Sequence, residues 1–198
     1  SFRNEKKAAA EKIAEQAKEI IRTVGLEEKL TSYPFQLSGG MARRVLVSTA
    51  LITDAQLIIA DEPTPGMSLG QAMEALQMFR EMANEGKAVI LITHDIDLAF
   101  EFADRVAVFY AGTTVETAPV KDFKIGPDAL RHPYSKALWR ALPQNGFQSI
   151  DGFQPYAGNL PKGCLFAPRC PFATEQCRTQ VPPAREIRDG EVRCFHAT

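Results

Sequence analysis

The spacing of apolar residues predicts two helices and a buried strand at the start of the chain. Within residues 5–24 apolar side chains recur every three to four positions from Ile13 onwards, which is typical of a helix with one buried face, and Gly25 is suited to its C-cap. A second helix is expected from Ser38 to about Thr53. The apolar run 56–60 then predicts a parallel strand that is covered on both faces.

The next stretch alternates helical and strand patterns. The pattern predicts a helix over 69–85, a strand over 88–93, a helix over 96–103 and two strands over 105–110 and 113–117. Gly86 is expected to end the first of these helices, and strand, helix and strand in this order predict a right-handed βαβ unit. Ala111-Gly112 is suited to the turn of a hairpin, and the core is expected to end near Ala118.

The composition changes after residue 118. Prolines and glycines become frequent, and a single helix is expected over 132–141, which we interpret as a docking helix in a linker. The tail from Pro161 contains all four cysteines of the chain and has little periodicity. The pattern therefore predicts a tail with little regular structure, held together by something other than a hydrophobic core.

Composition and charge restrict the class of protein. The chain has 198 residues, 45% hydrophobic and 24% charged, and a formal net charge of −1, which gives no reason to expect nucleic acid or an anionic lipid surface as a partner. The apolar run 88–92 is far shorter than the roughly 20 residues needed to cross a bilayer, and the first residues do not resemble a signal peptide. A soluble, cytosolic chain is expected.

Two carboxylates and a histidine follow neighbouring strands. Asp61 and Glu62 come directly after the strand 56–60, and His94 follows the next strand. Ligands of open α/β sheets lie at this edge, where Asp61 could hold Mg²⁺ through water and Glu62 could orient or deprotonate a water that attacks a phosphate. His94 could contact that phosphate or hold the water. Each residue alone could instead be structural, so the prediction depends on their occurring together.

Ser38, Gly39 and Gly40 form a potential anion site at the start of the second helix. Backbone N–H groups and the positive end of a helix attract anions, and Ser38 is a suitable N-cap. Asp61 follows Gly40 by 21 residues, which is enough for a helix of about four turns and a strand. The chain contains no G-x-x-x-x-G-K-[ST] sequence, so the pattern predicts only part of a nucleotide site.

The sequences LSGGM, LIIADEPT and LITHD, in this order, resemble the signature loop, Walker B strand and switch histidine of ABC-type ATPases, over about residues 1–118. The resemblance implies an α/β fold with a partial helical subdomain, and it implies ATP and Mg²⁺ as ligands. It also implies a head-to-tail dimer with a second ABC ATPase subunit, in which Ser38, Gly39 and Gly40 contact ATP held by the partner's Walker A. The missing Walker A and Q-loop indicate the C-terminal portion of a longer subunit, inactive by itself.

The chain departs from the family pattern at two places. Residues 65–68 read Pro-Gly-Met-Ser where the family usually has a D-loop close to Ser/Thr-Ala-Leu-Asp, and Met41 replaces the usual Gln of the signature. Ser68 stands where the family's aspartate is expected. The first departure leaves open whether this site turns over ATP.

The tail has a narrower resemblance. RHPYSKALWRALP followed by GCLFAPRCPFATEQCR is similar to the C-terminal extension of oligopeptide, dipeptide and nickel importer ATPases, in which four cysteines hold a [4Fe–4S] cluster. Here the cysteines are Cys164, Cys170, Cys177 and Cys194, with 5, 6 and 16 residues between them. Zinc sites favour closer pairs, but Zn²⁺, unligated thiols and disulfides remain alternatives to the cluster.

These expectations combine into one hypothesis. The chain is predicted to be part of the ATP-hydrolysing subunit of a bacterial ABC importer of peptides, nickel or similar solutes, bound to transmembrane permease subunits at the cytoplasmic face of the membrane. Its expected segments are a helical subdomain (1–54), the C-terminal part of the ATPase core (55–118), a linker with a docking helix (119–160) and a Cys-rich, metal-stapled extension (161–198). The alternatives are a non-catalytic regulatory or scaffold module and, less favoured, an ATPase of chromosome or repair machinery.

Overall fold

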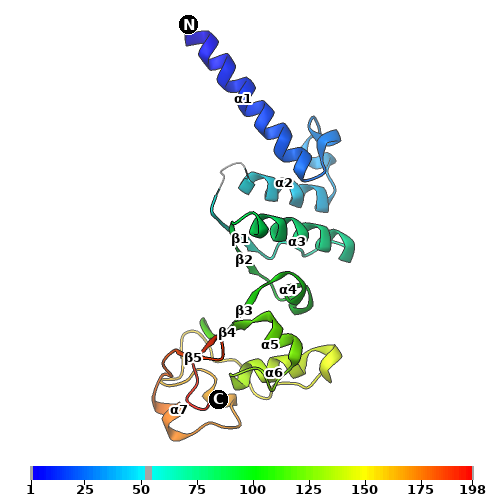
Figure 1. The fold of residues 1–198 in the computed structure, drawn as a ribbon. Coiled ribbons are helices and arrows are strands. Elements are labelled where there is room, and N and C mark those ends of the chain that lie inside the picture. Colours follow the sequence, from blue (N-terminus) through cyan, green and yellow to red (C-terminus); the bar gives the residue numbers. More distant parts are fainter. Residues whose placement is uncertain (1, 52–54, 198) are drawn as a thin grey trace. The chain divides into compact units, whose positions relative to one another are not determined.

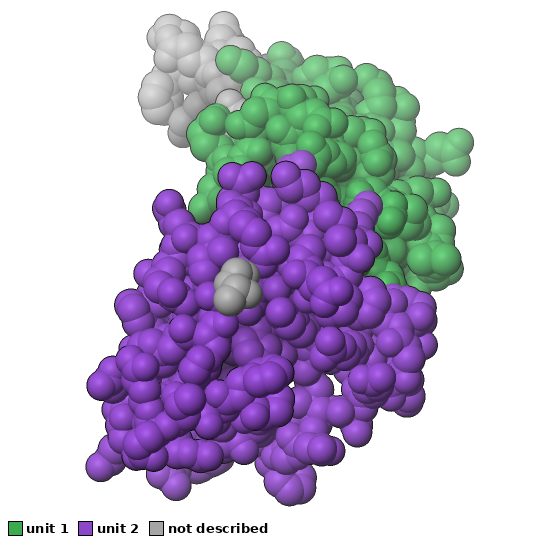
Figure 2. All heavy atoms as spheres, turned by 60° about the horizontal axis from the view of Figure 1, so that its bottom comes forward, with its two compact units in different colours: residues 1–102 green, residues 103–198 purple. Residues whose placement is uncertain are grey.

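The computed structural model describes residues 2–51 and 55–197. The chain forms two compact units, residues 1–102 and 103–198 (Figure 2). The expected end of the second helix, near Thr53, lies outside the described residues. Within the described ranges, none of the helices has the length and apolar character needed to cross a membrane.

The first unit begins with helix α1 (Phe2–Thr23), close to the predicted bounds. Gly25 adopts a φ of 67°, and the N–H of Leu26 donates to the carbonyl of Ile21 at 3.0 Å, which confirms the predicted C-cap. The predicted buried face is only partly confirmed, because Ile13 is 65% exposed whereas Val24 is buried. The apolar stripe of α1 therefore packs mainly near its C-terminal end, where α1 contacts helix α2.

The remaining elements of this unit follow in the predicted order (Figure 1). They are η1 (Glu27–Lys29), η2 (Pro34–Gln36), α2 (Gly39–Leu51), β1 (Leu57–Asp61), α3 (Leu69–Asn84), β2 (Ala88–Ile92) and α4 (Ile96–Phe102). Strands β1 and β2 are parallel neighbours, paired from Leu57 opposite Ala88 to Asp61 opposite Ile92. Since α3 connects them, the predicted parallel βαβ arrangement is confirmed.

Only one face of the β1–β2 pair is buried in this chain. Ile58 and Ala60 join a core with the apolar face of α3 and with Leu98 of α4. On the other face, Ile59 is 61% and Ile90 48% exposed. The expectation that this strand is covered on both faces is therefore wrong for the described chain, because no described element shields the second apolar face.

The second unit is built around a four-stranded antiparallel sheet with the order β3-β4-β6-β5. Its elements are β3 (Arg105–Tyr110), β4 (Thr113–Pro119), α5 (Val120–Ile125), α6 (Pro133–Ala141), η3 (Pro143–Asn145), η4 (Ala167–Arg169), α7 (Glu175–Thr179), β5 (Arg185–Ile187) and β6 (Gly190–Val192). Ala111 and Gly112 have φ angles of 49° and 85°, which suit the turn of a tight hairpin and confirm that prediction. Strand β6 pairs with β4, so residues far apart in sequence share one sheet.

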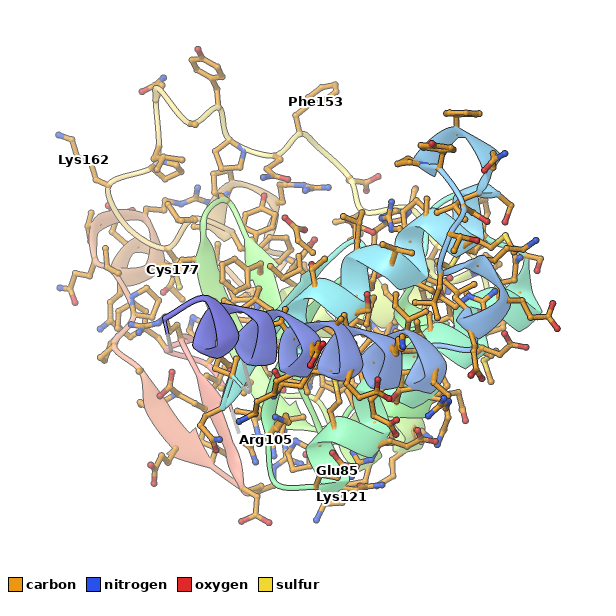
Figure 3. All side chains as sticks on the ribbon, turned by 90° about the horizontal axis from the view of Figure 1, so that it is seen from above. Glu85, Arg105, Lys121, Phe153, Lys162 and Cys177 are labelled. Carbon is orange, nitrogen blue, oxygen red and sulfur yellow. The ribbon has the colours of Figure 1, made fainter. Side chains whose placement is uncertain are left out.

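The expectation of a tail with little regular structure is wrong. Besides β5, β6 and α7, the tail is joined to the sheet by Arg131, whose side chain is fully buried. Its Nε donates to the carbonyl of Ile187 at 2.6 Å, and it also donates to the carbonyl of Arg188. The long loop before the tail is more exposed, and Phe153, at 94% exposure, projects from it (Figure 3).

Candidate functional site

The carboxyl ends of β1 and β2 carry the predicted acidic residues and the histidine. Asp61 is the last residue of β1 and is exposed, opposite Ile92 in the strand register. The next residue, Glu62, leaves the strand with a φ of 46°, and its N–H donates to the carbonyl of Ile92 at 2.8 Å. A positive φ is uncommon for a residue with a side chain, and here it turns the chain sharply at the strand end.

Glu62 and His94 form a hydrogen-bonded pair. Nδ1 of His94 donates to Oε1 of Glu62 at 2.7 Å, across 32 positions of sequence. The hydrogen bond to Glu62, together with its negative charge, raises the pKa of His94 above its ordinary value of 6.5. The His94 side chain is 81% exposed, so solvent screens this attraction.

The second oxygen of Glu62 has a different environment. Oε2 is buried and has no hydrogen-bond partner within the described part of the chain. A buried carboxylate oxygen normally accepts a hydrogen bond, so this atom is available to a donor that enters the site. Glu62 therefore has one oxygen hydrogen-bonded to His94 and one without a partner among the described residues.

The start of α2 has the predicted cap and an accessible surface. Ser38 Oγ accepts a hydrogen bond from the N–H of Met41 at 3.3 Å. Ser38 and Gly39 are exposed, and a Cβ added to Gly39 would have no atom within 4 Å. Gly40 is buried, and a Cβ added there would lie 3.0 Å from Nε2 of Gln71. The backbone at Ser38 and Gly39 can therefore be approached closely by another molecule.

One residue that the sequence reasoning missed joins α2 to the strand edge. Arg43 lies one turn into α2, and its Nε donates to the carbonyl of Pro63 at 2.9 Å. The same guanidinium donates to the carbonyl of Glu62. No spacing rule distinguishes this arginine from its neighbour Arg44, because its role depends on the turn that brings residues 62 and 63 beneath the helix.

Ser68, at the position where the sequence departs from the family pattern, is the N-cap of α3. Its Oγ accepts from the N–H of Gln71 at 3.4 Å, and its own N–H donates to Oε1 of Gln71 at 3.1 Å. This reciprocal pair is a capping box. Ser68 therefore has a local structural role that its side chain fulfils within its own unit.

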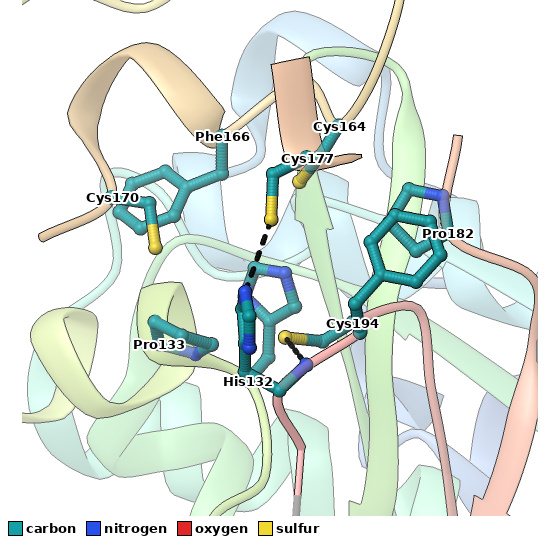
Figure 4. A pocket seen from close by; sticks show the side chains of 10 residues that line it. His132, Pro133, Cys164, Phe166, Cys170, Cys177, Pro182 and Cys194 are labelled. Carbon is teal, nitrogen blue, oxygen red and sulfur yellow. Dashed lines mark hydrogen bonds between the residues drawn. The ribbon is translucent and has the colours of Figure 1, made fainter. Parts of the chain in front are cut away.

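The second unit brings all four cysteines to one pocket. Cys164, Cys170, Cys177 and Cys194 line it together with His132, Phe166 and His196, among others (Figure 4). All four are thiols and none forms a disulfide. Burial raises the pKa of Cys164, Cys170 and Cys194, and the charges of the other cysteines add to this.

Further polar groups surround these thiols. Cys177 Sγ lies 3.3 Å from both Thr174 Oγ1 and His196 Nε2, and the N–H of His196 donates to Cys194 Sγ at 3.4 Å (Figure 4). Among the described residues, no group of three or more His, Cys, Asp or Glu side chains is arranged to hold a single metal ion. The donor set of four sulfurs around one pocket nevertheless has the chemistry that a larger, sulfur-ligated group requires.

His132 is a further residue of this pocket that the sequence reasoning did not identify as functional. It is 1% exposed and is the N-cap of α6, where its Nδ1 accepts from the N–H of Tyr134 at 3.0 Å. Burial lowers the pKa of His132 to about 4, so the ring is neutral at pH 7. The only sequence signal was its place directly before the proline that starts a helix.

Comparisons with known proteins agree with this division. Residues 1–65 match the family model "ABC transporter", and residues 115–177 match "Oligopeptide/dipeptide transporter, C-terminal region". Two solved ATP-binding cassettes of ABC transporters, one free of nucleotide and one in its ADP conformation, have TM-scores of 0.55 and 0.54 at 24% identity. Each covers 60% of this chain, and the chain covers 49% and 48% of them, respectively, which supports the α/β cassette fold.

Relatives with known names align with nearly the whole chain. The dipeptide transport ATP-binding protein DppD of Haemophilus influenzae is 38% identical over 89% of this chain, and the protein of the same name from Escherichia coli is 37% identical over 92%. The oligopeptide transport ATP-binding protein AppD of Bacillus subtilis is 37% identical over 91%. The chain spans 55 to 58% of the length of these relatives. Residues 1–65 therefore match the ABC transporter family, residues 115–177 match the C-terminal region of oligopeptide/dipeptide transporters, and the chain as a whole is similar to dipeptide and oligopeptide transport ATP-binding proteins.

Proposed function

We propose that this chain is part of an ATPase subunit that energises the import of peptides across a bacterial membrane. The observation that carries the proposal is the Glu62–His94 pair, held at 2.7 Å at the end of a parallel strand pair. The named relatives are dipeptide and oligopeptide transport ATP-binding proteins, which favours peptides as cargo. Nickel remains a prediction from the resemblance of the tail.

Glu62 acts as the general base in this proposal. Its buried Oε2 is the atom that would accept a proton from, or orient, the water that attacks the terminal phosphate of ATP. His94 holds the opposite oxygen of Glu62, so the carboxylate is positioned, and the exposed face of the imidazole can contact the phosphate. Asp61, exposed at the end of β1, would hold Mg²⁺ through water.

The exposed start of α2 is proposed to bind the ATP of a second subunit. Ser38 and Gly39 offer accessible backbone at the positive end of a helix of 13 residues, which favours a phosphate. Since the chain has no Walker A sequence, the loop that cradles the phosphates must come from another segment or chain. Head-to-tail pairing of two ATPase subunits on transmembrane permease subunits, at the cytoplasmic face of the membrane, satisfies this requirement.

The exposed apolar face of β1 and β2 supports the view that more of an ATPase core covers this chain. Leu57 and Ile59 on β1 are 50% and 61% exposed, and Ile90 and Ile92 on β2 are 48% and 47% exposed. Adjacent apolar residues of this kind are normally buried in a parallel sheet. In the proposal, the part of the cassette that contains the Walker A loop covers this face.

The four cysteines are proposed to hold a [4Fe–4S] cluster. The support is their convergence on one pocket and the absence of disulfides among them. Around one Zn²⁺ the four sulfurs would each lie about 2.3 Å from the ion, a tighter cluster than a cubane needs. When bound, such a cluster supplies four metal–thiolate bonds that cross-link the tail. The cluster would have a structural role, and the tail that it cross-links would form a docking surface for the permease.

The general-base assignment is tested by Glu62→Gln in the full-length protein assembled with its partner subunits. We expect ATP hydrolysis to fall by at least 100-fold, because a general base contributes about 10²–10⁴ in rate, while ATP-bound dimer accumulates. Glu74→Gln, an exposed carboxylate on α3, is the matched control and should leave turnover unchanged. Unchanged turnover in Glu62→Gln would refute the assignment. Absence of hydrolysis in the unsubstituted assembly would favour the regulatory or scaffold module instead.

A further inference from the structure

His132 lines the cysteine pocket and has a buried ring nitrogen for which the described residues provide no hydrogen-bond partner. The ring lines the pocket with Cys164, Cys170, Cys177 and Cys194 (Figure 4). Its Nε2 is buried and has no hydrogen-bond partner among the described residues. A buried N–H without an acceptor destabilises the folded state, so such an atom in a folded protein normally has a partner.

The helix cap fixes which nitrogen of His132 carries the proton. Nδ1 accepts a hydrogen bond from the N–H of Tyr134, so Nδ1 cannot itself be protonated. A neutral imidazole has one acceptor and one donor nitrogen, and the donor must therefore be Nε2. The cap of α6 thus makes His132 a fixed N–H donor at the wall of the pocket.

The orientation of His132 is held on several sides. Its backbone N–H donates to Glu116 Oε2 at 2.8 Å, and its ring centre lies 5.8 Å from that of Phe166. Glu116 and the neighbouring Arg131 are both fully buried. These contacts hold the imidazole ring in one orientation, so the position of its N–H is fixed before any ligand binds.

From these observations we propose that His132 Nε2–H donates a hydrogen bond to a sulfur of the group held by the four cysteines, either a thiolate or a sulfide. The inference rests on the proposed [4Fe–4S] cluster and assigns His132 as a residue that positions and tunes it. Hydrogen bonds to sulfur stabilise the more negative, reduced state of a cluster and so raise its reduction potential. The sulfur acceptor would also be the partner that the buried Nε2 lacks among the described residues.

His132→Asn separates the role of this residue as the N-cap of α6 from its proposed role as an N–H donor in the pocket. Asn is a good N-cap, so its side-chain oxygen can still accept from the N–H of Tyr134, but its short side chain withdraws the donor from the pocket. Ser135→Ala is the matched control, because Ser135 lies one turn further along α6 and also has a buried, unpartnered side-chain atom, yet does not line the pocket. Both variants are made in the full-length protein, purified without oxygen.

The measurements are iron and sulfide content and the midpoint potential followed by EPR during reduction with dithionite. We expect a full cluster in the wild type, His132→Asn and Ser135→Ala. The reduction potential of His132→Asn should be lower than that of the wild type by about 59 mV, which corresponds to a tenfold change in the equilibrium of a one-electron reduction. Ser135→Ala should keep the wild-type potential. An intact cluster with an unchanged potential in His132→Asn would overturn the role of His132 alone. Absence of iron and sulfide from the wild type would overturn the cluster and this inference together.

A second measurement does not require His132→Asn to fold. The chain has three histidines, and in a His196→Gln protein labelled with ¹⁵N-histidine only His132 remains at the pocket. Pulsed EPR of the reduced cluster should then detect a ¹⁵N coupling from His132. Its absence would contradict a hydrogen bond from Nε2 to the cluster sulfur.

Discussion

The buried cation Arg131 provides the sharpest test of how the second unit is held together. Its guanidinium and the carboxylate of Glu116 are both fully buried, with Nη1 of Arg131 3.3 Å from Glu116 Oε1. Nη2 lies 2.8 Å from Asp122 Oδ2, and Nε donates to the carbonyl of Ile187. One side chain thus joins β4, α5 and β5.

Replacing Arg131 by Met keeps most of the side-chain length but removes every one of these contacts. Removing one partner of a buried ion pair costs about 3–5 kcal/mol, because the remaining charge has lost its counter-ion. Glu116 keeps hydrogen bonds from the backbone N–H groups of Arg131 and His132, at 2.9 and 2.8 Å, and the carbonyls of the β5–β6 turn can reach water. We therefore expect a loss near the lower end of the range, about 3 kcal/mol.

Urea denaturation followed by Trp139 fluorescence measures this loss. Trp139 is the only tryptophan of the chain and lies in the second unit, where its Nε1 donates to the carbonyl of Phe123 at 2.9 Å. With a slope of about 1–3 kcal/mol per molar urea, the midpoint of Arg131→Met should fall by roughly 1–3 M. Lys121→Met is the control, because Lys121 pairs with Asp189 at 3.9 Å on the surface and its removal should cost less than about 1 kcal/mol. Equal midpoints for the two variants would refute the reasoning.

Two further predictions concern single contacts. Because Glu62 raises the pKa of His94, the pair contributes stability that is present below pH 6.5, the ordinary pKa of histidine, and is lost as pH rises through the raised pKa. Glu62→Gln should bring the pKa of His94 down towards 6.5. An NMR titration that gives the same pKa of His94 in both proteins would contradict this. Gly163→Ala should lower the urea midpoint of the Trp139 transition by the equivalent of about 1–3 kcal/mol, since the added Cβ would lie 2.3 Å from the carbonyl of Cys177. An unchanged midpoint would show that the backbone at Gly163 can move aside.

The elements that the sequence predicts correctly have local causes. Ser38 caps α2 because its hydroxyl reaches the N–H of Met41 three residues later, and Gly25 ends α1 because glycine tolerates a positive φ. The hairpin turn at Ala111-Gly112 likewise depends on two adjacent residues. The approach of His94 to Glu62 follows from a general rule of parallel sheets, because the carboxyl ends of neighbouring strands share one edge.

The features that the sequence did not reveal depend on distant partners. Strands β5 and β6 have three residues each, too few for a period to be recognised, and β6 is stabilised by pairing with β4 about 75 positions earlier. Arg131 looks like a surface cation, and only the fold encloses it with Glu116. The run 56–60 has the pattern of a strand buried on both faces, but the pattern does not show which segment of a protein packs against the second face.

The contacts that organise the two candidate sites lie in separate units, and this bears on the role of the proposed cluster. Arg43 and the backbone of Ile92 hold Glu62 at the strand edge within residues 1–102. Within residues 103–198, Glu116 accepts hydrogen bonds from the backbone N–H groups of Arg131 and His132, and His132 lines the cysteine pocket. A thiolate-bound group in the second unit would therefore act on contacts other than those that hold Glu62. In the proposed function, the cluster would act through the surface of the second unit, and the phosphate chemistry would depend on the start of α2 and the strand edge of the first unit.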